Sequence, residues 1–165
     1  MPNSVKLTAD MQCVLNEQRL GFVASVCEDG TPNLSPKGTT TVWDDEHIVF
    51  ADICSPGTVA NLRHHPVVEI NVVDPVSRKG YRFKGPATVH QDGAVFEQGL
   101  AFYRQRGIRS PIQSIVLVRV ERAIPLTSPA YDQGKGEEEI RASWLQYWSA
   151  LYGQRLDQAL PVEDA

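Results

Sequence analysis

The sequence predicts a mainly β fold, in which six antiparallel strands close into a small barrel with helices outside it. Two patterns lead to this prediction. Short segments rich in β-branched and aromatic residues are separated by tight polar turns, and Asp29-Gly30 is a strong hairpin signal. Helical periodicity then appears between the later strands. Strands of this length and order close naturally into a barrel flanked by helices.

The first half of the chain is expected to form one short helix and three strands. Thr8 suits the N-cap of the helix, because its hydroxyl can accept a hydrogen bond from a free amide of the first turn. The strands are expected at 20–27, 32–43 and 47–52. Pro36 interrupts the second strand near its start, since proline donates no hydrogen bond to a ladder.

The second half alternates between helices and strands. Ser55 suits an N-cap and Pro56 suits the first helical position, so a helix is expected over 55–65, where Pro66 ends it. The remaining elements are expected as strands at 67–73, 79–89 and 112–120, and as helices at 93–105 and from Glu137 onward.

Length and composition indicate one globular domain over residues 1–165, with the barrel at about 20–123 and a C-terminal loop and helix at about 124–153. The net charge of -4 argues against a nucleic-acid-binding protein, which needs a clustered positive field. No apolar run approaches the roughly 20 residues that span a membrane. The three cysteines are an odd number, which argues against a disulfide framework, and no zinc-binding motif occurs. We therefore expect a cytoplasmic protein without a metal site.

The turn before the second helix is the first candidate site. Ser55 and Thr58 offer hydroxyls, and Gly57 leaves the backbone uncovered. The free amides of a helix start point to the same place, and together these groups suit a phosphate. The alternative is an ordinary Ser-Pro helix cap, which is what the local sequence alone favours.

Two further segments combine small and basic residues. Ser35-Pro36-Lys37-Gly38 lies on a strand that Pro36 and Gly38 weaken, which would let a flat ligand approach the backbone. A protective lysine on an edge strand is the equal alternative. The second segment is 77–80, which carries Arg78 and Lys79; its alternative is a solvated, positively charged strand start.

Taken in order, these segments resemble the pyridoxamine 5'-phosphate oxidase-like family of FMN-binding split barrels. The stretches that carry the resemblance are 20–26, 30–38, 55–62 and 74–85. The likeness runs from about Leu20 to Val120. It implies a split barrel that binds FMN at the subunit interface of a homodimer. The aromatic residues Trp144, Tyr147 and Trp148 also suit core or dimer packing.

The resemblance also implies roles for individual residues. Ser35, Pro36, Lys37 and Gly38 would run along the isoalloxazine ring and the ribityl chain, with Asp52 near the ring. Ser55, Thr58 and Asn61 would hold the phosphate. Arg78, Lys79 and Gly80 would approach the cofactor, from the same chain or from its partner. Lys37 would lie near the pyrimidine edge of the ring and stabilise reduced, anionic flavin. No residue is assigned as catalytic.

The sequence departs from the family in two places. Pro56-Gly57 stands where the oxidase carries an Arg-Lys pair, so Lys37, Arg78 or Lys79 must supply the positive charge. The arginine-rich substrate motif at the C-terminus has no counterpart, so oxidation of pyridoxamine phosphate itself is not expected. The resemblance therefore implies an FMN-dependent oxidoreductase of unknown substrate. Two alternatives stay open: a non-catalytic carrier of flavin, haem or deazaflavin, and a fold whose cofactor site has decayed.

Overall fold

The computed structural model describes residues 4–159, and the side chains of residues 4–153. The chain forms two compact units. The first comprises Met1–Val73 and Gly80–Pro125, and the second comprises Asp74–Lys79 and Leu126–Ala165. The prediction of one domain over residues 1–165 therefore stays a prediction, and each unit is described by itself. Among the described residues, no helix combines the length and the apolar character that a membrane crossing requires.

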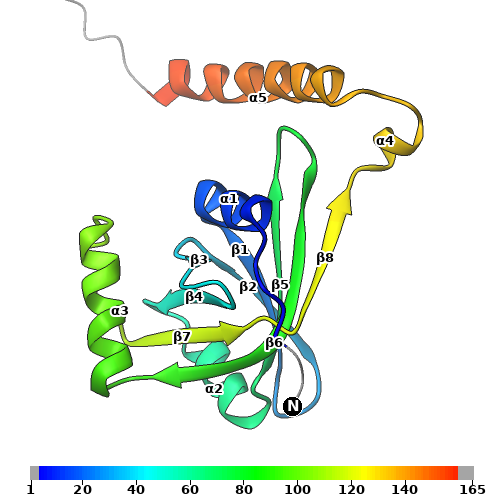
Figure 1. The fold of residues 1–165 in the computed structure, drawn as a ribbon. Coiled ribbons are helices and arrows are strands. Elements are labelled where there is room, and N and C mark those ends of the chain that lie inside the picture. Colours follow the sequence, from blue (N-terminus) through cyan, green and yellow to red (C-terminus); the bar gives the residue numbers. More distant parts are fainter. Residues whose placement is uncertain (1–3, 160–165) are drawn as a thin grey trace, which may run out of the picture. The chain divides into compact units, whose positions relative to one another are not determined.

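The elements follow the order that the sequence predicts, with two additional strands and one additional short helix, which lies in the predicted C-terminal loop (Figure 1). Helices are found at α1 Ala9–Gln18, α2 Pro56–His64, α3 Gly93–Gln105, α4 Pro129–Asp132 and α5 Glu137–Ala159. Strands are found at β1 Gly21–Val26, β2 Pro32–Lys37, β3 Thr41–Val42, β4 His47–Asp52, β5 Val67–Asp74, β6 Lys79–His90, β7 Ser114–Arg119 and β8 Arg122–Thr127.

The strands form one sheet in the order β2-β1-β5-β6-β7-β4-β3, and β8 pairs with β6 off this path. The pairings with a defined register are antiparallel, as the tight turns predict. In the turn between β1 and β2, Gly30 adopts a positive φ of 83°, which glycine tolerates without strain. The prediction of an antiparallel split barrel with flanking helices is confirmed.

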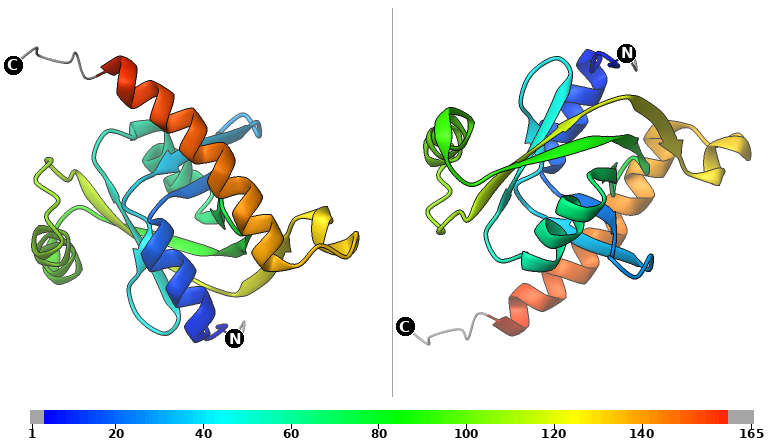
Figure 2. Two further views of the ribbon diagram at one scale, coloured as in Figure 1. Left: turned by 90° about the horizontal axis from the view of Figure 1, so that it is seen from above. Right: turned by 90° about the horizontal axis from the view of Figure 1, so that it is seen from below.

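Two apolar clusters fill the first unit, and β4 separates them. Ile48 and Phe50 point to the larger cluster, whereas Val49 and Ala51 point to a smaller one. This alternation explains why β4 is buried on both of its faces. Tyr103 of α3 completes the smaller cluster, because α3 packs against β7. Figure 2 shows α3 nearly end-on beside the strands.

The helices of the first unit cover different parts of the sheet. α1 contacts β3, and α2 contacts β1. Thr8 caps α1 as predicted, since its Oγ1 accepts a hydrogen bond of 3.3 Å from the Met11 amide. α2 buries Val59 and Leu62 against the barrel. This packing fixes the start of α2 beside the ends of β2 and β4.

Candidate functional site

The ammonium group of Lys37 lies inside the protein at the end of β2. The residue is only 4% exposed. Its Nζ donates hydrogen bonds of 2.6 Å to Ser35 Oγ and of 2.6 Å to Ser55 Oγ. Burial lowers the pKa of Lys37, and the charge of Asp52 opposes this shift only in part. A buried positive charge therefore connects β2 to the start of α2.

Lys37 has neutral partners where a buried cation is normally paired. Within the described part of the chain it forms no ion pair with a carboxylate. Hydroxyl groups satisfy the geometry of the ammonium but carry no opposing charge, and a buried charge is costly unless it is paired. The position therefore favours an anion in contact with Lys37.

Asp52 completes this group of polar residues from the end of β4. It is 5% exposed. One of its oxygens accepts a hydrogen bond of 2.6 Å from the Ser55 amide, and the other accepts one of 3.4 Å from Ser114 Oγ. Ser35, Lys37, Asp52 and Ser55 are called the Lys37 cluster below. The carboxylate of Asp52 orients the backbone of Ser55 at the point where α2 begins.

Ser55 occupies the predicted N-cap position of α2, but its side chain does not cap the helix. The structure gives Ser55 no side-chain capping hydrogen bond, because its hydroxyl accepts from Lys37 instead. Pro56 follows at the first helical position, as predicted. The start of a helix carries a partial positive charge from its free amides. The Lys37 ammonium and the free amides of α2 together increase the positive potential at this end of the helix.

Asn61 and Thr58 lie on the face of α2 that is turned toward the barrel, and both are buried. Asn61 Nδ2 donates a hydrogen bond of 3.0 Å to Ser25 Oγ and a longer one of 3.6 Å to Cys27 Sγ. Asn33 Nδ2 also donates to Ser25 Oγ, at 3.1 Å. Sequence reasoning missed Ser25. Its signal was a hydroxyl at an inward-facing position of β1, where alternation calls for an apolar residue.

Pro36 and Gly38 flank Lys37 on its two sides. Pro36 is exposed on β2, opposite Phe22 of β1, and β2 ends the strand order, where proline is tolerated. A Cβ built on Gly38 or on Gly57 would meet no other atom within 4 Å. Open space therefore lies beside the backbone both after β2 and at the first turn of α2.

Arg78 and Lys79 belong to the second unit, where other residues engage their charges. The Arg78 guanidinium lies 4.1 Å from the centroid of the Trp144 ring. Lys79 Nζ forms an ion pair of 2.6 Å with Glu137 and lies 4.7 Å from the centroid of the Tyr131 ring. These contacts attach the loop between β5 and β6 to α4 and α5. Of the three basic candidates, Lys37 is the one that forms neither an ion pair nor a ring contact among the described residues.

Gly80 has a packing role within the first unit. A Cβ at this position would lie 2.1 Å from the carbonyl oxygen of Val72. Any side chain would therefore clash with the backbone of β5. Close approach of two strands explains this glycine without a ligand.

The second unit is held together by ion pairs and by an aromatic row on α5. Arg141 pairs with Asp74 at 3.2 Å and with Glu137 at 3.0 Å. Burial raises the pKa of Asp74, but hydrogen bonds and the Arg141 charge outweigh this and lower it overall. Trp148 stacks on Tyr152 with 5.6 Å between ring centroids. The acidic first turn of α5 is thus used for structural pairing.

Comparison with known proteins places the first unit in a family. A family model described as pyridoxamine 5'-phosphate oxidase matches residues 7–126. None of the curated proteins matches the chain. Among solved structures, HupZ of Group A Streptococcus is 30% identical, with a TM-score of 0.67 over 73% of this chain and 94% of HupZ.

More distant structures share the same fold. An FMN-binding protein of Syntrophomonas wolfei subsp. wolfei is 15% identical, with a TM-score of 0.63 over 74% of this chain and 87% of that protein. An F420 reductase is 19% identical, with a TM-score of 0.56 over 71% of this chain and 98% of that protein. Because the family model covers most of the chain, this chain belongs to the pyridoxamine 5'-phosphate oxidase family.

Proposed function

We propose that the chain binds FMN and serves as an FMN-dependent oxidoreductase, with the 5'-phosphate at the Lys37 cluster. One observation carries this proposal: the hydrogen bonds that the structure describes for the buried Lys37 ammonium go to the hydroxyls of Ser35 and Ser55. A phosphate that displaces or bridges these hydroxyls would give the ammonium an anionic partner. Charge-assisted hydrogen bonds to phosphate are about twice as strong as neutral ones.

The residues around the cluster fit the remaining needs of a phosphate. The start of α2 adds amides and a favourable dipole. Gly57 leaves this part of the backbone open. Asp52 already accepts from the Ser55 amide and from Ser114, so its oxygens are turned to internal donors. The site therefore offers one cation, hydroxyls and a helix start, in place of the arginine–lysine pair expected of the family.

The position of Lys37 supports a role at the phosphate more than a role at the ring. Its Nζ donates one hydrogen bond to Ser35 on β2 and one to Ser55 at the start of α2. The ring and the ribityl chain would then extend from the cluster past the open backbone at Gly38. FMN, when bound, supplies the electron chemistry, and the chain supplies its binding, orientation and electrostatics.

Titration of the purified protein with FMN tests the proposal. We expect an absorbance spectrum of bound flavin at one FMN per chain, and a dissociation constant in the micromolar range or below. Ser55→Ala should weaken FMN about tenfold, since the lost contact is a hydrogen bond to a charged group, but should leave riboflavin unchanged. Ser110→Ala, at an exposed serine outside the cluster, is the control. Equal losses for FMN and riboflavin would place the phosphate elsewhere.

Turnover distinguishes an enzyme from a flavin carrier. We propose that the loaded protein is reduced by NADH or NADPH and passes the electrons to a small molecule. Stopped-flow absorbance of the bound flavin would follow that reduction. If the flavin exchanges electrons only with a protein partner, the carrier is the correct assignment. Separate titrations with haem and with deazaflavin test the other two cofactors that a carrier could hold in place of FMN.

We also propose that the protein is a homodimer, because one face of the sheet exposes apolar side chains. Phe22 and Val26 of β1, Leu34 of β2 and Val67 of β5 are between 40% and 66% exposed. The registers place these residues on one face. Such a patch marks an interaction surface. Light scattering should give twice the chain mass, and Leu34→Glu should reduce it to that of one chain without unfolding the barrel.

A further inference from the structure

In the loop that follows Lys37, a side chain takes the place of the backbone in strand pairing. β3 pairs with β4 so that Thr41 lies opposite Val49, and the same register would place Thr39 opposite Ala51. Instead, Thr39 Oγ1 accepts a hydrogen bond of 2.9 Å from the Ala51 amide and donates one of 3.3 Å to the Ala51 carbonyl oxygen. The hydroxyl of Thr39 therefore replaces the Thr39 backbone as the partner of β4.

Further internal hydrogen bonds hold this loop at both ends. Thr40 donates to the Lys37 carbonyl oxygen twice, through its amide at 3.3 Å and through its Oγ1 at 2.9 Å. The Thr39 carbonyl oxygen accepts a hydrogen bond of 2.9 Å from the Tyr103 hydroxyl. Thr39, Thr40 and Tyr103 are all buried. Interior hydroxyl groups from the loop and from α3 thus fix the position of the loop backbone.

Tyr103 reaches the loop because α3 packs closely on β7. A Cβ on Gly99, which precedes Tyr103 by one turn of α3, would lie 2.5 Å from Ile115 Cγ1, so glycine permits this close approach. Tyr103 is 1% exposed. Burial raises the pKa of Tyr103, so its hydroxyl stays protonated. Tyr103 is therefore a fixed hydrogen-bond donor to the loop.

The peptide group between Gly38 and Thr39 is left without an internal partner. Among the described residues, neither the Gly38 carbonyl oxygen nor the Thr39 amide forms a hydrogen bond. Gly38 is exposed, and a Cβ at this position would meet no other atom within 4 Å. Backbone polar groups need a hydrogen-bond partner. This peptide group is therefore available to water or to a ligand in the open space beside Gly38.

The place of this peptide group suits the ring of a flavin whose phosphate lies at the Lys37 cluster. Lysine carries its ammonium on a four-carbon stem, so the length of that stem separates the phosphate site from the Lys37 main chain. The ribityl chain separates the phosphate of FMN from the ring in a similar way. A ribityl chain that runs beside the Lys37 side chain would therefore bring the ring to Gly38. The polar edge of the ring carries carbonyl oxygens and ring nitrogens that accept hydrogen bonds.

We propose that Tyr103 and Thr39 are positioning residues, which hold the Gly38–Thr39 peptide group so that its N–H donates to an acceptor on the polar edge of the flavin ring. This inference rests on the proposed function, because it takes the FMN phosphate at the Lys37 cluster as its starting point. The side chains of Tyr103 and Thr39 act through the backbone and not by contact with the ring. A fixed donor at this edge favours the reduced ring, whose acceptor atoms carry more negative charge.

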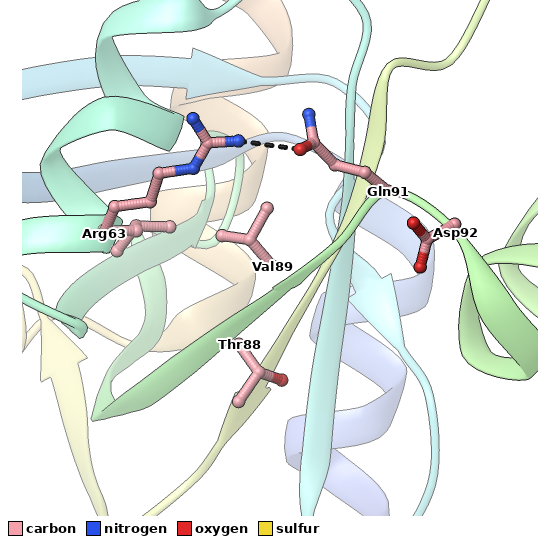
Figure 3. Close-up of a pocket in the computed structure, with 6 residues that line it drawn as sticks. Arg63, Thr88, Val89, Gln91 and Asp92 are labelled. Carbon is pink, nitrogen blue, oxygen red and sulfur yellow. Dashed lines mark hydrogen bonds between the residues drawn. The ribbon is translucent and has the colours of Figure 1, made fainter.

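A surface hollow beside α2 is the alternative place for the ring. Its lining residues are Leu62, Arg63, Thr88, Val89, Gln91 and Asp92. Figure 3 shows the Arg63 guanidinium turned toward the Gln91 side chain, to which it donates a hydrogen bond of 2.7 Å. Arg63 follows Ser55 by eight residues, which corresponds to roughly 12 Å along a helix axis, whereas Gly38 adjoins Lys37 in the chain. The Gly38 side is therefore the nearer one to the phosphate site.

The dissociation constant of FMN and the midpoint potential of the FMN-saturated protein together test the inference. Tyr103→Phe and Thr39→Val each remove one hydroxyl and should weaken FMN roughly threefold to tenfold, the size of one neutral hydrogen bond. Both variants should also shift the midpoint potential to more negative values, because the reduced ring loses a fixed donor. Thr39→Ser keeps the hydroxyl and should restore both quantities. Tyr81→Phe is the matched control, since the Tyr81 hydroxyl donates to Asp10 at an exposed place on β6, and it should change neither quantity.

The midpoint potential separates positioning from a purely structural role, and Thr39→Val supplies the test if Tyr103→Phe does not fold. If both variants keep the wild-type potential, whatever their stability in urea, the positioning role is refuted and the proposed function stands. If Thr88→Trp, which would fill the hollow of Figure 3, weakens FMN while Tyr103→Phe and Thr39→Val do not, the ring lies beside α2 and the inference is again refuted. If the wild type does not bind FMN at micromolar concentration, the proposed function and the inference both fail.

Discussion

Replacement of Lys37 by methionine should weaken FMN binding and stabilise the ligand-free protein at the same time. Methionine preserves most of the length of the side chain and removes the charge. The two effects have opposite signs because the ammonium is buried beside neutral hydroxyls in the ligand-free chain and would meet a phosphate in the complex. A purely structural lysine would show no such opposition.

The magnitudes follow from the contacts of Lys37. A hydrogen bond that involves a charged group contributes about 1.5–3 kcal/mol, so loss of the ammonium should raise the dissociation constant of FMN roughly 10- to 100-fold. In the ligand-free protein the pKa of Lys37 is lowered, which means that burial outweighs the attraction of Asp52. Removal of the charge should therefore stabilise the protein by up to about 1 kcal/mol, the low end of the range for buried charges replaced by apolar side chains.

The pH dependence has a defined sign. The folded protein holds the Lys37 proton less tightly than the unfolded chain, where the pKa is 10.5. Between the lowered folded pKa and 10.5 the unfolded state binds more protons, so the stability of the wild type rises with pH in this window. Lys37→Met lacks that rise. FMN affinity of the wild type should fall through the same window, because deprotonation removes the charge that the phosphate needs.

Urea denaturation over a pH series measures the first effect, and quenching of flavin fluorescence measures the second. Lys84→Met is the matched control, since the Lys84 side chain is 51% exposed on β6. The control should change neither quantity by more than a few tenths of a kcal/mol. If Lys37→Met binds FMN as tightly as the wild type, the phosphate does not contact Lys37. If the variant is less stable at every pH, the ammonium has a structural role and the reasoning is wrong.

Three further substitutions test the fold by urea denaturation. Gly85→Ala should cost about 3 kcal/mol, because a Cβ there would lie 1.8 Å from the carbonyl oxygen of Arg119; an unchanged midpoint would contradict this close approach. Tyr103→Phe should cost about 1–2 kcal/mol, since the buried hydroxyl donates a hydrogen bond of 2.9 Å to the Thr39 carbonyl; a neutral effect would mean that water replaces the hydroxyl. Thr8→Ala should cost about 1 kcal/mol through the lost cap of α1, whereas Thr8→Ser should restore most of it.

The order and type of the elements were predictable from local patterns. Tight turns, caps and periodicity act over a few residues, and the helix at 93–105 was predicted with the bounds that the structure has. One strand was missed: β8, which contains Pro125. Proline argues against a central strand, but β8 lies off the main strand path, where a missing donor is tolerated. The expected strand at 32–43 divides into β2 and β3, since Gly38 separates them.

The candidate site shows what local sequence patterns do not determine. The sequence by itself determined the antiparallel barrel, its helices and the three segments that carry small and basic residues, because these features depend on neighbours in the chain. Only the tertiary structure decided that Lys37 is buried against Ser55, eighteen residues away, and that Lys79 is paired with Glu137, fifty-eight residues away. Burial and pairing depend on contacts between distant segments, and they decide which charge is left for an anion.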